Sequence, residues 1–218
     1  MKLLKKAMCL ILPAVIAVGF SACSLMPTSA QTSSATSALP EYDKNAASFP
    51  SEGYSLKFIK VFSDYASEGV FSYSEAQNGK EQNGTPYVHK LYADFMPYES
   101  LEIINEMEQN ADALTKEQKD ESLKKIYASL KNVFFITVYN KETLGAALAG
   151  GKDISETTGC ADNRLVGEQE GLVYYFSVSK ASINELSAES QKAYKALQDG
   201  IPDIVQGVTL FKPEKEKG

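Results

Sequence analysis

Three residues carry most of the chemistry that this sequence could offer: Cys23, Cys160 and His89. A cysteine can be acylated, oxidised or used as a nucleophile, and a histidine can relay protons or bind a metal. His89 is the only histidine, which excludes two-histidine zinc sites, and no GxSxG elbow accompanies it. The strand pattern around His89 favours a half-exposed structural position, so the sequence predicts no catalytic residue, no metal site and no cofactor.

Cys23 follows the segment that decides where the protein is sent. Lys2, Lys5 and Lys6 precede the apolar run Ala7–Phe20, and small residues then lead to the cysteine in "FSAC". The run has 14 residues and a membrane span needs about 20, so the pattern is typical of an export signal over 1–22.

The end of this signal resembles the lipobox of bacterial lipoproteins, with Phe20 where leucine is usual. The resemblance implies a lipid-modified (thioether-linked, commonly palmitate-bearing) Cys23 as the first mature residue, and attachment to the exported side of the cell membrane or envelope. Two or more acyl chains give stable anchoring, since each buried methylene contributes roughly 0.8 kcal/mol. The alternative is an ordinary cleaved signal in which Cys23 has no role.

Residues 23–51 read as a flexible tether, because they are small, polar and interrupted by prolines. One folded domain is then expected over 52–213, with a charged tail over 214–218. Loss of Lys2, Lys5 and Lys6 with the signal lowers the formal net charge from −6 to −9, and Arg164 is the only arginine. This balance disfavours nucleic-acid binding.

Cys160 is the one cysteine left without a partner after Cys9 leaves with the signal and Cys23 is acylated. It cannot form an intramolecular disulfide or a CxxC pair. The two interpretations are a buried small apolar residue beside a turn and a thiol that contacts a partner. The segment "GAALAGGKD" (145–153) fails as a phosphate-binding loop, because Ala146 and Asp153 replace the required glycine and hydroxyl residue.

The remaining chain predicts a single α+β domain with a mixed or antiparallel sheet of about five to six strands and three to four helices packed on it. Thr115 opens a capping box, "TKEQ", and the polar, Asn-Gly-rich stretch 75–85 reads as a mobile loop. Tyr174 and Tyr175 must point to opposite faces of one strand, so one of them could line a groove. The expected segments are strands over 54–65, 86–97, 133–139 and 208–213, a hairpin over 164–178, and helices over 99–110, from 115, over 141–149 and over 186–200.

From Tyr87 onward the order of segments resembles the non-catalytic N-terminal module of bacterial redoxin (thioredoxin-like) lipoproteins. The likeness runs through "VHKLYADFMPYES", "VFFITVYNKETLGAAL", "LVGEQEGLVYYFSVS" and "LSAESQKAYKALQDGIPDIVQGVTLFKP". In that family a redoxin domain with a CxxC site follows, whereas here only five residues follow Pro213.

The resemblance therefore implies a stand-alone accessory domain without enzymatic activity, with a thioredoxin-like lipoprotein as a candidate partner. The alternative function is small-ligand binding in a tyrosine-lined groove. The residues expected to contact a ligand or partner are Tyr174, Tyr175 and Cys160.

Overall fold

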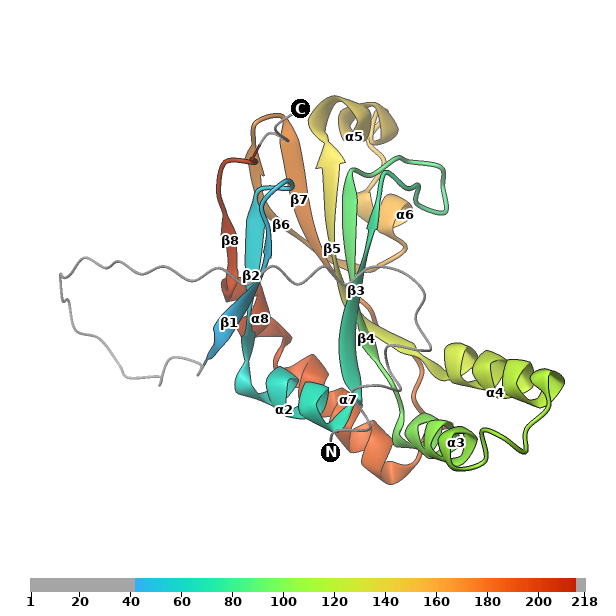
Figure 1. Cartoon of the computed structure of the whole chain (residues 1–218). Coiled ribbons are helices and arrows are strands. Elements are labelled where there is room, and N and C mark those ends of the chain that lie inside the picture. The colour runs from blue at the N-terminus through green and yellow to red at the C-terminus, as the bar shows by residue number, and fades with distance from the viewer. Residues whose placement is uncertain (1–41, 215–218) are drawn as a thin grey trace. The chain divides into compact units, whose positions relative to one another are not determined.

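The computed structural model describes residues 42–214, with side chains from Ala46 onward. It contains helices and eight strands, the strands forming two antiparallel sheets (Figure 1). The predicted α+β class is confirmed. The sequence predicted one sheet of about five to six strands, whereas the strands expected near 54–65 and 208–213 belong to a separate three-stranded sheet. The five-stranded sheet instead includes Phe71–Gln77, a strand that the sequence did not predict.

The five-stranded sheet has the order β3-β4-β5-β7-β6, and every neighbouring pair is antiparallel. Its centre is β5, which is apolar on both faces as the sequence predicted. One face, here called the inner face, carries the main core; the opposite face is the outer face. The strand bounds are β3 Phe71–Gln77, β4 His89–Phe95, β5 Lys131–Asn140, β6 Asp162–Gln169 and β7 Leu172–Val178.

The second sheet packs on the inner face. It has the order β1-β2-β8, with bounds Tyr42–Phe49, Tyr54–Ile59 and Val208–Leu210. Tyr54 of β2 lies against Tyr174 of β7, with ring centroids 6.1 Å apart. Strand β1 falls inside the predicted tether, so the fold begins before the expected boundary at 52. Phe49 is the one large apolar residue of 46–49, and the other residues are held in the strand by backbone hydrogen bonds to β2. The hydropathy of the sequence therefore gives no signal for this strand.

Three helices cover the remainder of the inner face: α2 (Lys60–Glu68), α7 (Ala188–Asp199) and α8 (Ile201–Gln206). The strand expected over 54–65 ends at Ile59 and continues as α2, because Phe62 and Tyr65, three residues apart, reach the same core from one face of a helix. Gly200 allows α7 to approach α2 closely, since a Cβ at this position would lie 2.9 Å from the Phe62 ring.

Helices α3 (Tyr98–Gln109) and α4 (Lys116–Ser129) form a hairpin between β4 and β5. The predicted capping box is present: the Thr115 hydroxyl accepts from Gln118 N–H, and the Gln118 side chain accepts from Thr115 N–H. Two short helices, α5 (Lys141–Ala147) and α6 (Ile154–Thr158), lie beside the outer face. No helix within 42–214 is both long and apolar enough to cross a membrane.

Candidate functional site

The predicted contact residues occupy different environments. Cys23 lies outside the described residues. Tyr174 is buried on the inner face, where its hydroxyl donates to the Glu52 carbonyl oxygen at 2.7 Å. Tyr175 is half-buried on the outer face. The two tyrosines therefore lie on opposite faces, as expected, but Tyr174 cannot line a surface groove.

His89 is fully buried on the inner face, so the predicted half-exposed position is wrong. Its Nδ1 lies 3.1 Å from the Tyr54 hydroxyl, and its Nε2 lies 3.0 Å from Glu75 Oε2. The chain Tyr54–His89–Glu75 resembles a proton relay in composition. Burial and the nearby Glu52 charge raise the pKa of Tyr54 well above its ordinary value, which favours the protonated phenol.

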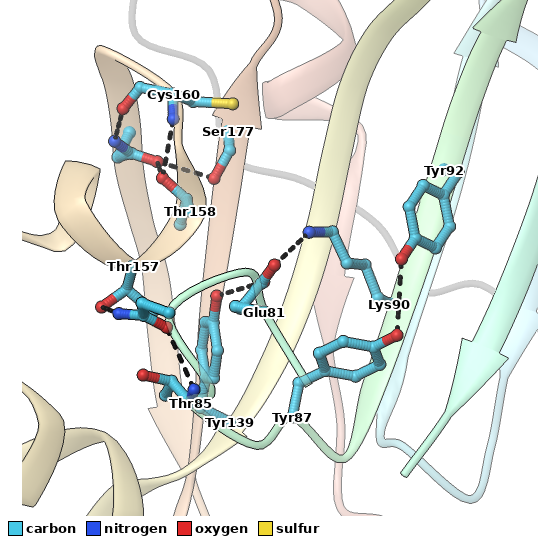
Figure 2. Close-up of polar contacts among 12 residues, drawn as sticks. Glu81, Thr85, Tyr87, Lys90, Tyr92, Tyr139, Thr157, Thr158, Cys160 and Ser177 are labelled. Carbon is cyan, nitrogen blue, oxygen red and sulfur yellow. Dashed lines mark hydrogen bonds and ion pairs between the residues drawn. The ribbon is translucent and has the colours of Figure 1, made fainter. Parts of the chain in front are cut away.

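Cys160 is buried beside the outer face, just before β6 (Figure 2). Burial raises the pKa of its thiol, while the Lys90 charge lowers it and the Glu81 charge raises it. The neutral thiol is therefore favoured, and a neutral thiol is a poor nucleophile. Of the two interpretations left open by the sequence, the buried apolar residue describes this environment.

A buried ion pair lies on the outer face. Lys90 Nζ of β4 lies 2.7 Å from Glu81 Oε2, and the two side chains are each only 6% exposed. The Tyr139 hydroxyl donates to the other carboxylate oxygen of Glu81 at 2.7 Å (Figure 2). Burial and the adjacent Glu81 charge raise the pKa of Tyr139, so it remains a donor. These three side chains are called the Lys90 cluster below.

Three aromatic rings surround the ammonium group of Lys90. Its Nζ lies 4.6 Å from the ring centroid of Phe135, 5.4 Å from Tyr92 and 5.8 Å from Tyr87. These distances suit cation–π attraction, which strengthens when the cation is desolvated. The hydroxyl oxygens of Tyr87 and Tyr92 lie 3.4 Å apart (Figure 2). Lys90 thus exchanges its hydration for one carboxylate and three ring faces.

Glu81 reaches this position because the loop 78–88 folds back over the sheet. Glu81 N–H donates to the Thr85 carbonyl at 2.8 Å, and Val88 N–H donates to the Val138 carbonyl at 2.8 Å. Asn83 bonds both Thr85 N–H and the Thr157 hydroxyl of α6. The expectation of a mobile loop over 75–85 is therefore wrong, because the buried Glu81 carboxylate anchors these turns. Composition alone does not distinguish this carboxylate from one that is solvated.

Thr137 lies between Lys90 and Tyr175 in the register of the outer face. Its side chain is fully buried, and its hydroxyl forms no hydrogen bond with any described residue. The Thr137 hydroxyl lies near the Tyr139 phenol and opposes the rise in the Tyr139 pKa, although the two groups lack hydrogen-bond geometry. A buried hydroxyl without a hydrogen-bond partner costs folding free energy.

Beside the Lys90 cluster the outer face is aromatic and partly open. Tyr92 pairs with Phe135 across β4 and β5, their rings 5.5 Å apart and perpendicular. Tyr175 pairs with Leu165 across β7 and β6, and Leu165 is 54% exposed. Tyr92, Phe135 and Tyr175 are half-buried and Leu165 is exposed, and these four residues of β4, β5, β7 and β6 are here called the outer aromatic patch.

An open depression lies elsewhere, along α7, and none of its lining residues is a tyrosine: Ala188, Gln191, Lys192, Lys195, Ala196 and Asp199. Within 42–214 there is no group of three or more His, Cys, Asp or Glu side chains that could hold a metal ion. Comparison with protein-family models, with curated proteins and with solved structures found no match.

Sequence reasoning identified Tyr175 but missed Glu81 and Lys90. Lys90 and Tyr92 share one strand face at a spacing of two, which was visible in the sequence. The carboxylate partner was not visible, because Glu81 lies in a polar loop whose return over the sheet depends on tertiary contacts.

Proposed function

We propose that this protein is a lipid-anchored lipoprotein of the bacterial cell envelope, and that its α+β domain is a non-enzymatic module that binds a protein partner through the outer aromatic patch. The export signal and lipobox-like "FSAC" support the anchor. The outer aromatic patch is the observation that supports the binding role, because aromatic residues are enriched at the buried centres of interfaces.

The chemistry of the buried groups also favours binding over catalysis. Lys90, Glu81 and Tyr139 satisfy one another, and Tyr54 and Cys160 are held in their neutral forms by burial. A catalytic nucleophile needs the opposite property, a lowered pKa or an adjacent general base that activates it next to the substrate. The resemblance to the redoxin-lipoprotein module supports a thioredoxin-like protein as the partner.

Photo-crosslinking tests this proposal in the full chain, in envelopes of the source bacterium. A photoreactive amino acid at Leu165 should link the chain to a thioredoxin-like protein, identified by mass spectrometry. The same amino acid at Tyr127, a 47% exposed aromatic position on α4, is the matched control. Adducts of equal yield at both positions, or none with a thioredoxin-like protein at Leu165, would contradict the proposal.

The anchor has a separate test. Cys23→Ala should move the full chain from the membrane fraction to the soluble fraction and remove the mass of the acyl chains. Retention of membrane binding by this variant would contradict lipid attachment at Cys23, whatever the crosslinking result.

Small-ligand binding is the second candidate function, and the half-buried Tyr175 on the outer face favours it. A ligand present at 100 times its dissociation constant should stabilise the fold by about 2.7 kcal/mol. A thermal-shift screen of envelope metabolites should then show a shift that Tyr175→Ala reduces. A screen without any shift would eliminate this candidate.

A further inference from the structure

Strand β3 forms one edge of the five-stranded sheet (Figure 1). Asn78 N–H donates to the Val88 carbonyl and Met96 N–H donates to the Val70 carbonyl, so even-numbered residues of this segment bond toward β4. In an antiparallel ladder the odd-numbered residues then direct their N–H and C=O groups away from the sheet. No described element pairs with this side of β3.

The other sheet edges carry features that oppose pairing, and β3 carries fewer of them. Strand β6 has a register shift between Leu165 and Gly167 and contains Asp162, Arg164 and Glu168. Strand β1 has a register shift, and the three-residue β8 lies against β6. Bulges, charges and short strands are the usual protections of exposed edges. The seven residues of β3 contain no proline, lysine or arginine, and their register with β4 is continuous. Their one charged residue, Glu75, is paired with His89 Nε2 of the same chain.

The sequence of β3 allows it to pair with a second copy of itself without opposing like charges. We infer that β3 pairs antiparallel with β3 of a second copy of this chain, about a two-fold axis at Ser74, so that the two five-stranded sheets become one. In this register Tyr73 faces Glu75 of the second copy, Phe71 faces Gln77, and Ser72 faces Ala76. A shift that places Glu75 opposite its own copy would oppose two carboxylates, which is destabilising. A shift centred on Tyr73 would leave Gln77 unpaired.

The side chains on both faces of β3 fit this arrangement. Ser72, Ser74 and Ala76 point to the outer face and are small, so they let the two copies approach. On the inner face Tyr73 stacks on Phe58 at 5.5 Å and leaves 45% of its surface exposed. Tyr73 would lose much of this exposure against the second copy. An isologous pair of this kind closes on itself and does not extend into fibres.

Cysteine crosslinking tests the register in the full chain, in membranes of an expressing bacterium. Ser74 would meet its own copy as a non-hydrogen-bonded pair, where Cα atoms are about 4.5 Å apart, within the range of a disulfide. Ser74→Cys should therefore form a covalent dimer under mild oxidation, with peptide mapping identifying a disulfide that joins the two copies through the substituted position. The mapping separates this bond from one through Cys23, so the result does not depend on the lipid anchor.

Ser72→Cys is the matched control, since it changes the same residue type on the same strand face. It should give at least about tenfold less dimer, because its own copy lies four residues away along the strand. A chain with Ser72→Cys and a second chain with Ala76→Cys, expressed together, should form a disulfide with each other. This pair tests the same register if Ser74→Cys fails to fold. Absence of both the Ser74→Cys dimer and this mixed dimer, or equal dimer yields from Ser72→Cys and Ser74→Cys, would overturn the inference.

Discussion

Replacing Glu81 by glutamine should destabilise the domain strongly, because the change removes one charge of a buried ion pair and keeps the shape. Lys90 and Glu81 are each 6% exposed and 2.7 Å apart, so Lys90 would remain buried without its counter-charge. Breaking one partner of such a pair costs about 3–5 kcal/mol. For a domain of this size each kcal/mol lowers the melting temperature by about 2–4 °C, which gives a fall of about 6–20 °C.

The assay is thermal and urea unfolding of the full chain, followed by far-UV circular dichroism. Glu121→Gln on α4 is the matched control, because it removes the same charge from an exposed ion pair. Glu121 is 68% exposed, Lys125 is 64% exposed, and their charged groups lie 3.0 Å apart. An exposed pair contributes about 0–1 kcal/mol.

The double variant Glu81→Gln/Lys90→Met should recover part of the lost stability, since it removes the uncompensated buried charge. If Glu81→Gln costs no more than Glu121→Gln, or if the double variant is less stable than both single variants, the view of the Lys90 cluster as a buried, mutually compensated pair is wrong.

Three further outcomes follow from the structure. Cys160 should react with a thiol reagent much more slowly in the folded chain than in urea, because its thiol is buried and burial raises its pKa. Equal reaction rates would show that the thiol is accessible in the folded chain. Burial first and the Glu52 charge second raise the pKa of Tyr174 from 10.0 to about 12. The stabilisation that follows from this shift is fully present below pH 10 and is lost as the pH rises to about 12. The free energy of unfolding measured against pH should therefore fall less steeply at alkaline pH in Tyr174→Phe than in the unchanged chain. Gly79→Ala should lower the free energy of unfolding by about 1–3 kcal/mol, because the new Cβ would lie 2.2 Å from the Tyr87 hydroxyl oxygen. Gly145→Ala should not destabilise the domain, because no atom lies within 4 Å of its Cβ position. The urea midpoints of the two variants test this difference.

The elements predicted well are those whose signal is local. The capping box at Thr115 and the doubly apolar strand β5 follow from residues adjacent in the chain, and both are present. Strand β1 was missed because its pairing with β2, rather than its composition, makes it a strand. Helix α2 was missed because "LKFIKVF" fits a strand and a helix equally well over so short a run.

The candidate site was harder to predict than the fold, for a related reason. Tyr175 could be identified because consecutive residues of a strand alternate between faces. His89 was misplaced because its two hydrogen-bond partners, Tyr54 and Glu75, come from separate strands and compensate its burial. Glu81 and Lys90 are similar: each alone reads as a solvated charge, and only their contact compensates the loss of hydration on burial.

The three-stranded sheet also determines how the domain would bear a mechanical load. The described chain enters β1 at Tyr42, opposite Ile59, and leaves β8 at the other end of β2, where Leu210 pairs with Tyr54 and Phe211 N–H donates to the Gly53 carbonyl. Strands β1 and β8 therefore run in the same direction on either side of β2. A force applied between the two ends of the domain would pull these strands along their axes, so that many hydrogen bonds must break together instead of one after another. A domain held at its N-terminal end and drawn from its C-terminal end would resist unfolding by shear.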